Sequence, residues 1–224
     1  MTDEPLTPAL EPLLELLRDD PAAPVSKDSA ARAREVHLAD ALSGLEIEEL
    51  RDAGRIADLG SGAGLPGLVL AASLPEAEVD LVESSSRRCE FLRRAIERMG
   101  IANATVVCER AEEWAGAAGR EAYEAVTARA VGRLATLAEL ASPLLREGGV
   151  LAAWKGRRDV GEEAEAARAA EPVAMEPVRV VSVEPYPGSR DRHIHVLRKN
   201  GPTPQRLPRR PGMAARRPFG SESK

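Results

Sequence analysis

The sequence predicts an α/β fold with a mostly parallel, seven-stranded sheet whose last two strands form an antiparallel hairpin. Two observations support this prediction. From residue 55 onward, apolar runs of strand length alternate with helical segments, which is typical of a parallel sheet covered on both faces. The last two extended runs are joined only by Pro185-Tyr186-Pro187-Gly188, a connection too short for a parallel crossover.

The elements follow in chain order as three segments. Residues 1–54 are expected to be a helical segment, with one helix carrying leucines at helical spacing and one or two more within residues 29–51; the leucines are Leu6, Leu10, Leu13, Leu14, Leu16 and Leu17. The central domain, residues 55–199, is expected to hold strands near 55–59, 79–83, 104–108, 123–128, 149–154, 177–184 and 192–198, and helices near 65–74, 86–99, 132–145 and 160–170. Gly148-Gly149 is expected to form a turn. Residues 200–224 form a basic tail rich in Pro and Arg.

Composition excludes several classes of protein. The chain has 224 residues, 43% of them hydrophobic, which is enough for a sizeable core. It contains no run of 18 apolar residues, so we expect no membrane span, and the start Met1-Thr2-Asp3-Glu4-Pro5 does not look like a signal peptide. Cys89 and Cys108 lack metal-ligand spacing, so we expect two reduced cysteines, no metal, and a monomeric cytoplasmic protein.

Charge is distributed unevenly along the chain. The net charge is −5, yet residues 190–217 hold nine basic residues and one acidic residue, so this segment carries +8 and the remainder −13. A basic tail on an acidic body suggests a polyanionic partner. A solvated tail would show the same composition.

The stretch Ile56-Ala-Asp-Leu-Gly-Ser-Gly-Ala-Gly-Leu-Pro-Gly67 predicts a nucleotide-binding strand–turn–helix unit. Gly60, Gly62 and Gly64 can present bare backbone to a ligand. Glu83 ends the next strand, 19 residues past Gly64, near the position where an acid accepts hydrogen bonds from ribose hydroxyls. NAD and S-adenosylmethionine (SAM) both suit such an acid. Asp58 favours SAM, because a carboxylate beside the turn would repel a pyrophosphate.

Further motifs resemble one family, the RsmG (GidB) methyltransferases, which use SAM to methylate guanine N7 in small-subunit rRNA. The motifs are Asp58 to Gly67, Val82-Glu83-Ser84, Arg110-Ala111-Glu112, Ala128-Arg129-Ala130-Val131, Trp154-Lys155-Gly156, His37-Leu-Ala-Asp40-Ala-Leu42, and the tail Leu207-Pro208-Arg209-Arg210-Pro211-Gly212 with Arg216-Arg217-Pro218. Leu65-Pro66-Gly67 and the tail motif are more specific than the glycines alone.

The resemblance implies a Rossmann-like class I methyltransferase fold, SAM as cofactor, and 16S rRNA of the small ribosomal subunit as partner, with guanine 527 as the target. It implies that Gly60, Leu65, Ala111, Glu112 and Arg129 line the SAM site. We expect Lys155, Arg209, Arg210, Arg216 and Arg217 to contact RNA, and Lys155, His37 and Asp40 to help position the base.

The residues also fit the chemistry. Guanine N7 carries an in-plane lone pair, so its methylation demands no general base, and catalysis can rest on alignment. The Asn/Asp-Pro-Pro-aromatic loop of amine methyltransferases is missing, since Ala128-Arg129-Ala130-Val131 stands at its place. Neither cysteine lies in such a loop to act as the nucleophile of a cytosine-C5 enzyme.

Three rival functions are weighed against this hypothesis. A small-molecule methyltransferase would not need a basic tail, an RNA-binding protein with a decayed SAM fold would not need Asp58 and Glu83, and an NAD oxidoreductase is disfavoured by Asp58. The tail itself allows two interpretations. Its arginines contact RNA phosphates, or the tail packs across the SAM pocket and its arginines pair with the acidic body.

Overall fold

The protein, described here from a computed structural model covering residues 8–220, contains one seven-stranded sheet in the order β3-β2-β1-β4-β5-β7-β6. The first five strands run parallel, and β7 pairs antiparallel with both β5 and β6. The strands are β1 (Arg55–Leu59), β2 (Glu78–Val82), β3 (Ala104–Val107), β4 (Tyr123–Arg129), β5 (Leu145–Lys155), β6 (Met175–Ser182) and β7 (His193–Lys199). The predicted fold class, including the antiparallel hairpin, is confirmed.

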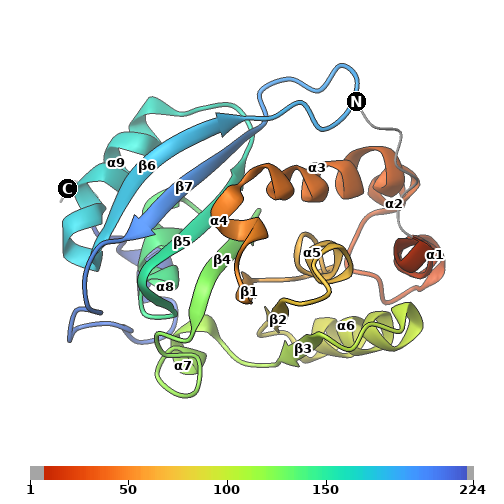
Figure 1. The fold of residues 1–224 in the computed structure, drawn as a ribbon, viewed down its shortest axis with the longest axis horizontal. Coiled ribbons are helices and arrows are strands. Elements are labelled where there is room, and N and C mark those ends of the chain that lie inside the picture. Colours follow the sequence, from red (N-terminus) through yellow and green to blue (C-terminus); the bar gives the residue numbers. More distant parts are fainter. Residues whose placement is uncertain (1–7, 221–224) are drawn as a thin grey trace.

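Helices cover both faces of the sheet (Figure 1). They are α1 (Glu11–Asp19), α2 (Lys27–Ala31), α3 (Ala39–Leu42), α4 (Glu48–Arg51), α5 (Gly67–Ser73), α6 (Ser86–Met99), α7 (Ala111–Trp114), α8 (Leu134–Ala141), α9 (Val160–Ala170) and α10 (Met213–Arg216), with short 3₁₀ or π segments η1 (Pro8–Leu10), η2 (Ala33–Leu38), η3 (Ser43–Glu46) and η4 (Glu171–Val173). The leucines of α1 share one core with α5 and α6, whereas α8 and α9 cover the other face. Leu6 lies outside the described residues.

Strand β5 begins earlier than the sequence predicts. The Gly148-Gly149 pair was expected to be a turn, but it lies inside the strand, which starts at Leu145 opposite Tyr123 and shifts register before Ala125. A side chain at Gly149 would bring Cβ within 2.9 Å of the Glu124 carbonyl oxygen, so glycine is what lets the two backbones approach here. Helix α8, predicted at 132–145, is correspondingly shorter and ends at Ala141.

The two cysteines also differ from expectation. Cys89 in α6 and Cys108 after β3 are joined in a disulfide, with their Cα atoms 5.8 Å apart. The expectation of two reduced thiols rested on their distance in sequence and the absence of a motif. Helix α6 packs against β3 and brings the two Cα atoms within the range a disulfide can span.

The basic tail is folded against the domain through residue 220; residues 221–224 lie outside the described part. Leu207 is buried in the same hydrophobic core as the apolar residues of α8. Lys199, at the end of β7, is buried and its ammonium donates to Glu121, to the Leu145 carbonyl oxygen and to Thr203, which directs the chain from the sheet into the tail. Within residues 8–220, no helix is long and apolar enough to cross a bilayer.

Candidate functional site: two adjoining cavities at the carboxyl edge

Two cavities open where β1, β2, β4 and β5 end and where β7 begins, at the edge where open α/β sheets bind ligands. One, here called the turn cavity, has a volume of about 330 Å³ and lies over the ends of β1 and β2. The other, here called the strand cavity, has a volume of about 520 Å³ and lies over the ends of β4 and β5. Ala130, directly after β4, lines both cavities. A group bound in one is therefore next to a group bound in the other.

The glycine turn places backbone at the wall of the turn cavity. Gly60 has a φ of +65°, and a Cβ on it would lie 2.9 Å from the Val131 side chain. Its amide donates to the Val82 carbonyl oxygen at 2.8 Å, which ties the turn to the neighbouring strand. Only glycine can adopt this φ and leave room for the Val131 side chain without strain.

Asp58, at the end of β1, holds this turn through hydrogen bonds. Its carboxylate is buried and accepts hydrogen bonds from the Thr127 hydroxyl at 2.8 Å and from the Gly67 amide at 3.2 Å. Burial raises the pKa of Asp58 to about 6, against the opposing effect of these hydrogen bonds. The sequence suggested that this carboxylate faces a ligand's ammonium group. In the structure its partners are the Thr127 hydroxyl and the first amide of α5, so Asp58 ties the end of β1 to β4 and to α5.

Glu83 lies at the wall of the turn cavity and is almost fully buried. One carboxylate oxygen accepts from the Gly62 amide at 3.1 Å and the other from the Ser85 amide at 2.9 Å. The Arg88 guanidinium lies 3.6 Å away. These contacts hold the carboxylate in one orientation, as an acceptor of ligand hydroxyl groups requires.

Ala111 and Glu112 form the opposite wall at the start of α7. The Glu112 carboxylate is largely buried and accepts a hydrogen bond from the Gly212 amide at 2.7 Å. Gly212, Ala214 and Ala215 complete the same wall. The tail is thus part of the turn cavity, as one of the two interpretations of the tail anticipated.

In the strand cavity, an acid from the N-terminal segment meets a base from the sheet. Asp40 of α3 accepts a hydrogen bond from Arg129, at the end of β4, over 3.1 Å. Both side chains are mostly buried and both line the cavity. The resemblance implies that Arg129 lines the SAM site. The structure places it in the strand cavity, next to Ala130, which both cavities share.

The other two predicted positioning residues lie in the same cavity. His37 Nε2 lies 2.6 Å from the Ser29 hydroxyl. Burial, and secondarily the charge of Arg129, lowers the pKa of His37 below its usual range, so the imidazole is neutral at pH 7. Lys155 ends β5, and its ammonium binds the Gly132 carbonyl oxygen at 2.7 Å and Glu162 at 2.5 Å.

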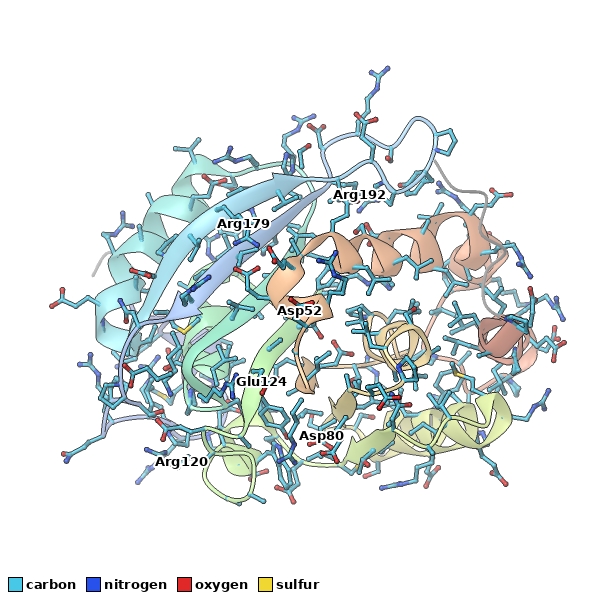
Figure 2. The ribbon with its side chains drawn as sticks, viewed as in Figure 1. Asp52, Asp80, Arg120, Glu124, Arg179 and Arg192 are labelled. Carbon is cyan, nitrogen blue, oxygen red and sulfur yellow. A yellow bond between two sulfur atoms is a disulfide. The ribbon has the colours of Figure 1, made fainter. Side chains whose placement is uncertain are left out.

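Sequence reasoning missed Arg192 and the lining role of Trp154. Figure 2 shows Arg192 beside the start of β7 and above α3, far from Glu124, which lies near the start of β4. Arg192 donates to the Tyr186 hydroxyl at 3.2 Å, and the Trp154 indole donates to the Asp40 carbonyl oxygen at 2.8 Å. The position of Arg192 could have been predicted from the sequence. The last strand was predicted to run antiparallel, so it must begin at the edge of the sheet where β5 ends.

The remaining predicted residues lie around the cavities or away from them. Gly62 and Gly64 shape the turn, both at positive φ, and Leu65 is buried in the core beneath it. Arg210, Arg216 and Arg217 are exposed on the tail, whereas Arg209 is paired with Glu139. The cation-rich strand cavity can therefore hold a polar planar group, and the turn cavity a ligand with hydroxyl groups.

Comparison with known proteins identifies relatives with the same sequence pattern. The family model of rRNA small subunit methyltransferase G (GidB) matches residues 25–195. Ribosomal RNA small subunit methyltransferase G of Rubrobacter xylanophilus is 44% identical over 82% of this chain and 72% of its own length. The protein of that name from Chloroflexus aggregans is 42% identical over 86% of this chain and 80% of its own length.

Solved structures share the fold at low sequence identity. The fibrillarin pre-rRNA processing protein of Methanococcus jannaschii has a TM-score of 0.58 at 19% identity, covering 75% of this chain and 76% of that one. A SAM-dependent O-methyltransferase of Thermotoga maritima has a TM-score of 0.56 at 14% identity, covering 74% and 66%. These two show the methyltransferase fold alone. The family match over most of the chain shows more: the chain belongs to the rRNA small subunit methyltransferase G family.

Proposed function

We propose that this protein transfers a methyl group from SAM to N7 of a guanine in 16S rRNA, guanine 527 by the family resemblance. The observation that carries the proposal is the pair of cavities that meet at Ala130, one walled by the glycine turn and Glu83, the other by Asp40 and Arg129. Donor and acceptor of a methyl group must approach along one line, and two adjoining cavities provide that geometry. We further propose that it acts in the cytoplasm as a monomer.

The turn cavity fits SAM in its chemistry. Its volume of about 330 Å³ is within the range of small-molecule sites. Glu83 is held by two backbone amides and can accept hydrogen bonds from the two ribose hydroxyls. Ala111 and the small residues of the tail leave room for a flat adenine. When bound, SAM supplies a methyl group on a positively charged sulfur, and every other contribution comes from the chain.

The strand cavity fits guanine because its groups complement those of the base. Guanine presents N7 and O6 as acceptors on one edge and N1–H and the 2-amino group as donors on another. The Asp40 carboxylate can accept from those donors, as carboxylates do, while the hydrogen bond from the guanidinium of Arg129 orients it. Binding the base by its donor edge leaves N7 free to face Ala130 and the turn cavity.

No residue needs to remove a proton from N7. The neutral His37 and the ion-paired Lys155 are consequently assigned to positioning. Lys155 holds the Gly132 carbonyl oxygen and Glu162, and Glu162 also accepts from the Leu134 amide at 2.7 Å. This set fixes the loop between β4 and α8, which carries Ala130. We propose that Lys155 and Arg192 also meet phosphates of the nucleotide bound there.

Contacts further along the RNA are assigned to the exposed arginines Arg210, Arg216 and Arg217. Arg209 was expected among them, but its bond to buried Glu139 occupies its guanidinium. We therefore propose a different role for Arg209 below.

The test is a map of methylated nucleosides in 16S rRNA. Deleting the gene should abolish one 7-methylguanosine, detected by mass spectrometry of rRNA fragments, and the purified protein with SAM should restore it on rRNA or small subunits from the deletion strain. A Gly60→Trp variant, which fills the turn, should not restore it. An unchanged map, or restoration of another modification, would contradict the proposal.

A further inference from the structure

The C-terminal segment from residue 207 to 219, here called the strap, crosses the molecule between the turn cavity and α8. Its inner side is fixed at two backbone points. The Gly212 amide donates to Glu112, and the Ala214 carbonyl oxygen accepts from the Thr136 hydroxyl at 3.1 Å. Gly212, Ala214 and Thr136 all line the turn cavity. The position of the strap therefore sets the shape of that cavity.

Arg209 adds a side-chain contact between the strap and the domain. The Arg209 guanidinium donates twice to the Glu139 carboxylate, each bond 2.5 Å long, and once to the Arg217 carbonyl oxygen at 2.7 Å. It also lies 4.2 Å from the centre of the Phe219 ring. Glu139 is 3% exposed. A two-bonded pair with a buried carboxylate is a strong and directional contact, and it closes the strap on itself between residues 209 and 217.

The Arg209–Glu139 contact, here called the anchor, and the turn cavity involve the same helix, α8. Glu139 lies on α8, and Thr136 and Leu140 of the same helix line the turn cavity. Residues three and four apart on a helix are neighbours on its surface. The contact that holds the strap is thus within one helical turn of the side chains that meet the cofactor.

The next residue has the opposite surroundings. Arg210 is exposed and adjoins Arg209 in sequence, and Arg216 and Arg217 are exposed on the same strap. Among residues 8–220, these three arginines form no ion pair, unlike Arg209. Two adjacent arginines of one motif thus face different ways, one to a buried carboxylate and one to solvent.

We propose that Arg209 is a positioning residue for the cofactor: through Glu139 it holds the strap as the outer wall of the SAM site, while Arg210 serves the RNA. This inference rests on the proposed function, because it takes SAM to be the ligand of the turn cavity. Without the anchor, Gly212–Ala215 would keep the bonds to Glu112 and Thr136 and the burial of Ala214, but would lose the ion pair to α8. The buried Glu139 would also lose its partner, which favours repacking of the strap.

The experiment compares two matched variants, Arg209→Ala and Arg210→Ala, which remove the same side chain from neighbouring positions. Calorimetry with S-adenosylhomocysteine, the demethylated product, well below the unfolding temperature should show binding about tenfold weaker in Arg209→Ala, as expected for a lost charge-assisted contact. Arg210→Ala should bind as the wild type does. Arg209→Lys should be intermediate, since lysine keeps the charge but not the two-bonded geometry.

A second measurement separates positioning from a general loss of stability. Hydrogen exchange should show that S-adenosylhomocysteine protects the amides of residues 212–216 in the wild type, and that Arg209→Ala exchanges them faster while the amides of β1 and β4 stay protected. Glu139→Gln should weaken binding as Arg209→Ala does. The double variant should be no weaker than the worse single one, because both changes break the same contact.

The outcomes distinguish this inference from the proposed function. Wild-type protein that does not bind S-adenosylhomocysteine would remove SAM from the turn cavity altogether. If the wild type binds and Arg209→Ala binds equally well, with only its unfolding temperature lowered, the positioning role is wrong and the anchor is merely structural. If Arg210→Ala weakened binding of S-adenosylhomocysteine as much as Arg209→Ala, the assignment of Arg209 to the cofactor and of Arg210 to RNA would also be wrong.

Discussion

The two cavities at the carboxyl edge of the sheet are built in different ways. The turn cavity is lined by the glycine turn, by small residues of the tail and by two carboxylates, Glu83 and Glu112, that are themselves held by amides; Arg88, Glu109 and Arg110 line it as well. The strand cavity is lined by charged side chains, the acid Asp40 beside the bases Arg129, Lys155 and Arg192. Its contributors come from three separate parts of the chain: the N-terminal segment, the central strands and the last hairpin.

This difference matches the two tasks we propose. A cofactor is the same in every turnover, so a rigid backbone turn supported by Asp58 suits it. A nucleotide must be drawn from a polyanion and oriented by its edges, which calls for cations and one well-placed acceptor. Each cavity should therefore respond to its own set of substitutions, and the predictions below test that separation.

The largest effect is expected at the turn cavity. Glu83→Ala should weaken SAM binding by about 1.5–3 kcal/mol, because a charged acceptor of hydroxyl groups is lost. Calorimetry with SAM and with NAD measures this, and NAD should give no signal. Glu109→Ala is the matched control, since Glu109 is an exposed carboxylate at the rim of the same cavity. Unchanged SAM affinity in Glu83→Ala would remove Glu83 from the cofactor site.

The second prediction concerns the strand cavity. Asp40→Asn should slow methyl transfer by roughly tenfold or more while SAM affinity stays the same, because a matched contact to a base is worth about 1–3 kcal/mol. The wild type should methylate a 16S rRNA fragment carrying inosine, which lacks the 2-amino group, more slowly than the guanine fragment. On the inosine fragment, Asp40→Asn should lower the rate only a little further. Asp191→Asn, an exposed acid next to Arg192, is the charge-matched control. Equal rates on guanine and inosine with the wild type would show that Asp40 does not read that edge.

The third prediction separates RNA contacts from cofactor contacts on the strap. Each lost phosphate contact lowers the slope of log affinity against log salt by about 0.7–0.9. Replacing Arg210, Arg216 and Arg217 by Ala should therefore reduce the slope by roughly 2–3 at unchanged SAM affinity. The salt dependence of rRNA binding measures this. A slope that does not move would assign the exposed arginines to something other than RNA.

The smallest effect is expected from pH. Burial lowers the pKa of His37 below the ordinary histidine value of 6.5, so the imidazole binds fewer protons in the folded than in the unfolded protein. Its contribution to stability is complete above that value and is lost as the pH falls through the lower folded pKa. Single-turnover methyl transfer should stay flat from about pH 7 to 9 in the wild type and in His37→Asn, since N7 needs no base. An ionisation in that range that disappears in the variant would reveal a general base.

Much of the fold and of the turn cavity could be predicted from the sequence, because the signals are local. The alternation of strands and helices, the glycines before α5 and the acid at the end of β2 lie within short windows. A turn at positive φ favours glycine wherever it occurs, so this turn can be predicted without knowledge of the rest of the chain. The antiparallel hairpin followed equally from the length of one connection.

The strand cavity, the disulfide and the anchor of the strap were decided by tertiary structure. Asp40 and Arg129 are 89 residues apart, and Arg209 and Glu139 are 70 apart. Nothing local distinguishes Arg209, which is paired, from Arg210, which is exposed. Long-range contacts of this kind depend on where the sheet and α8 place each backbone, because a charged side chain takes its role from the partner it meets and from how far that partner is removed from water.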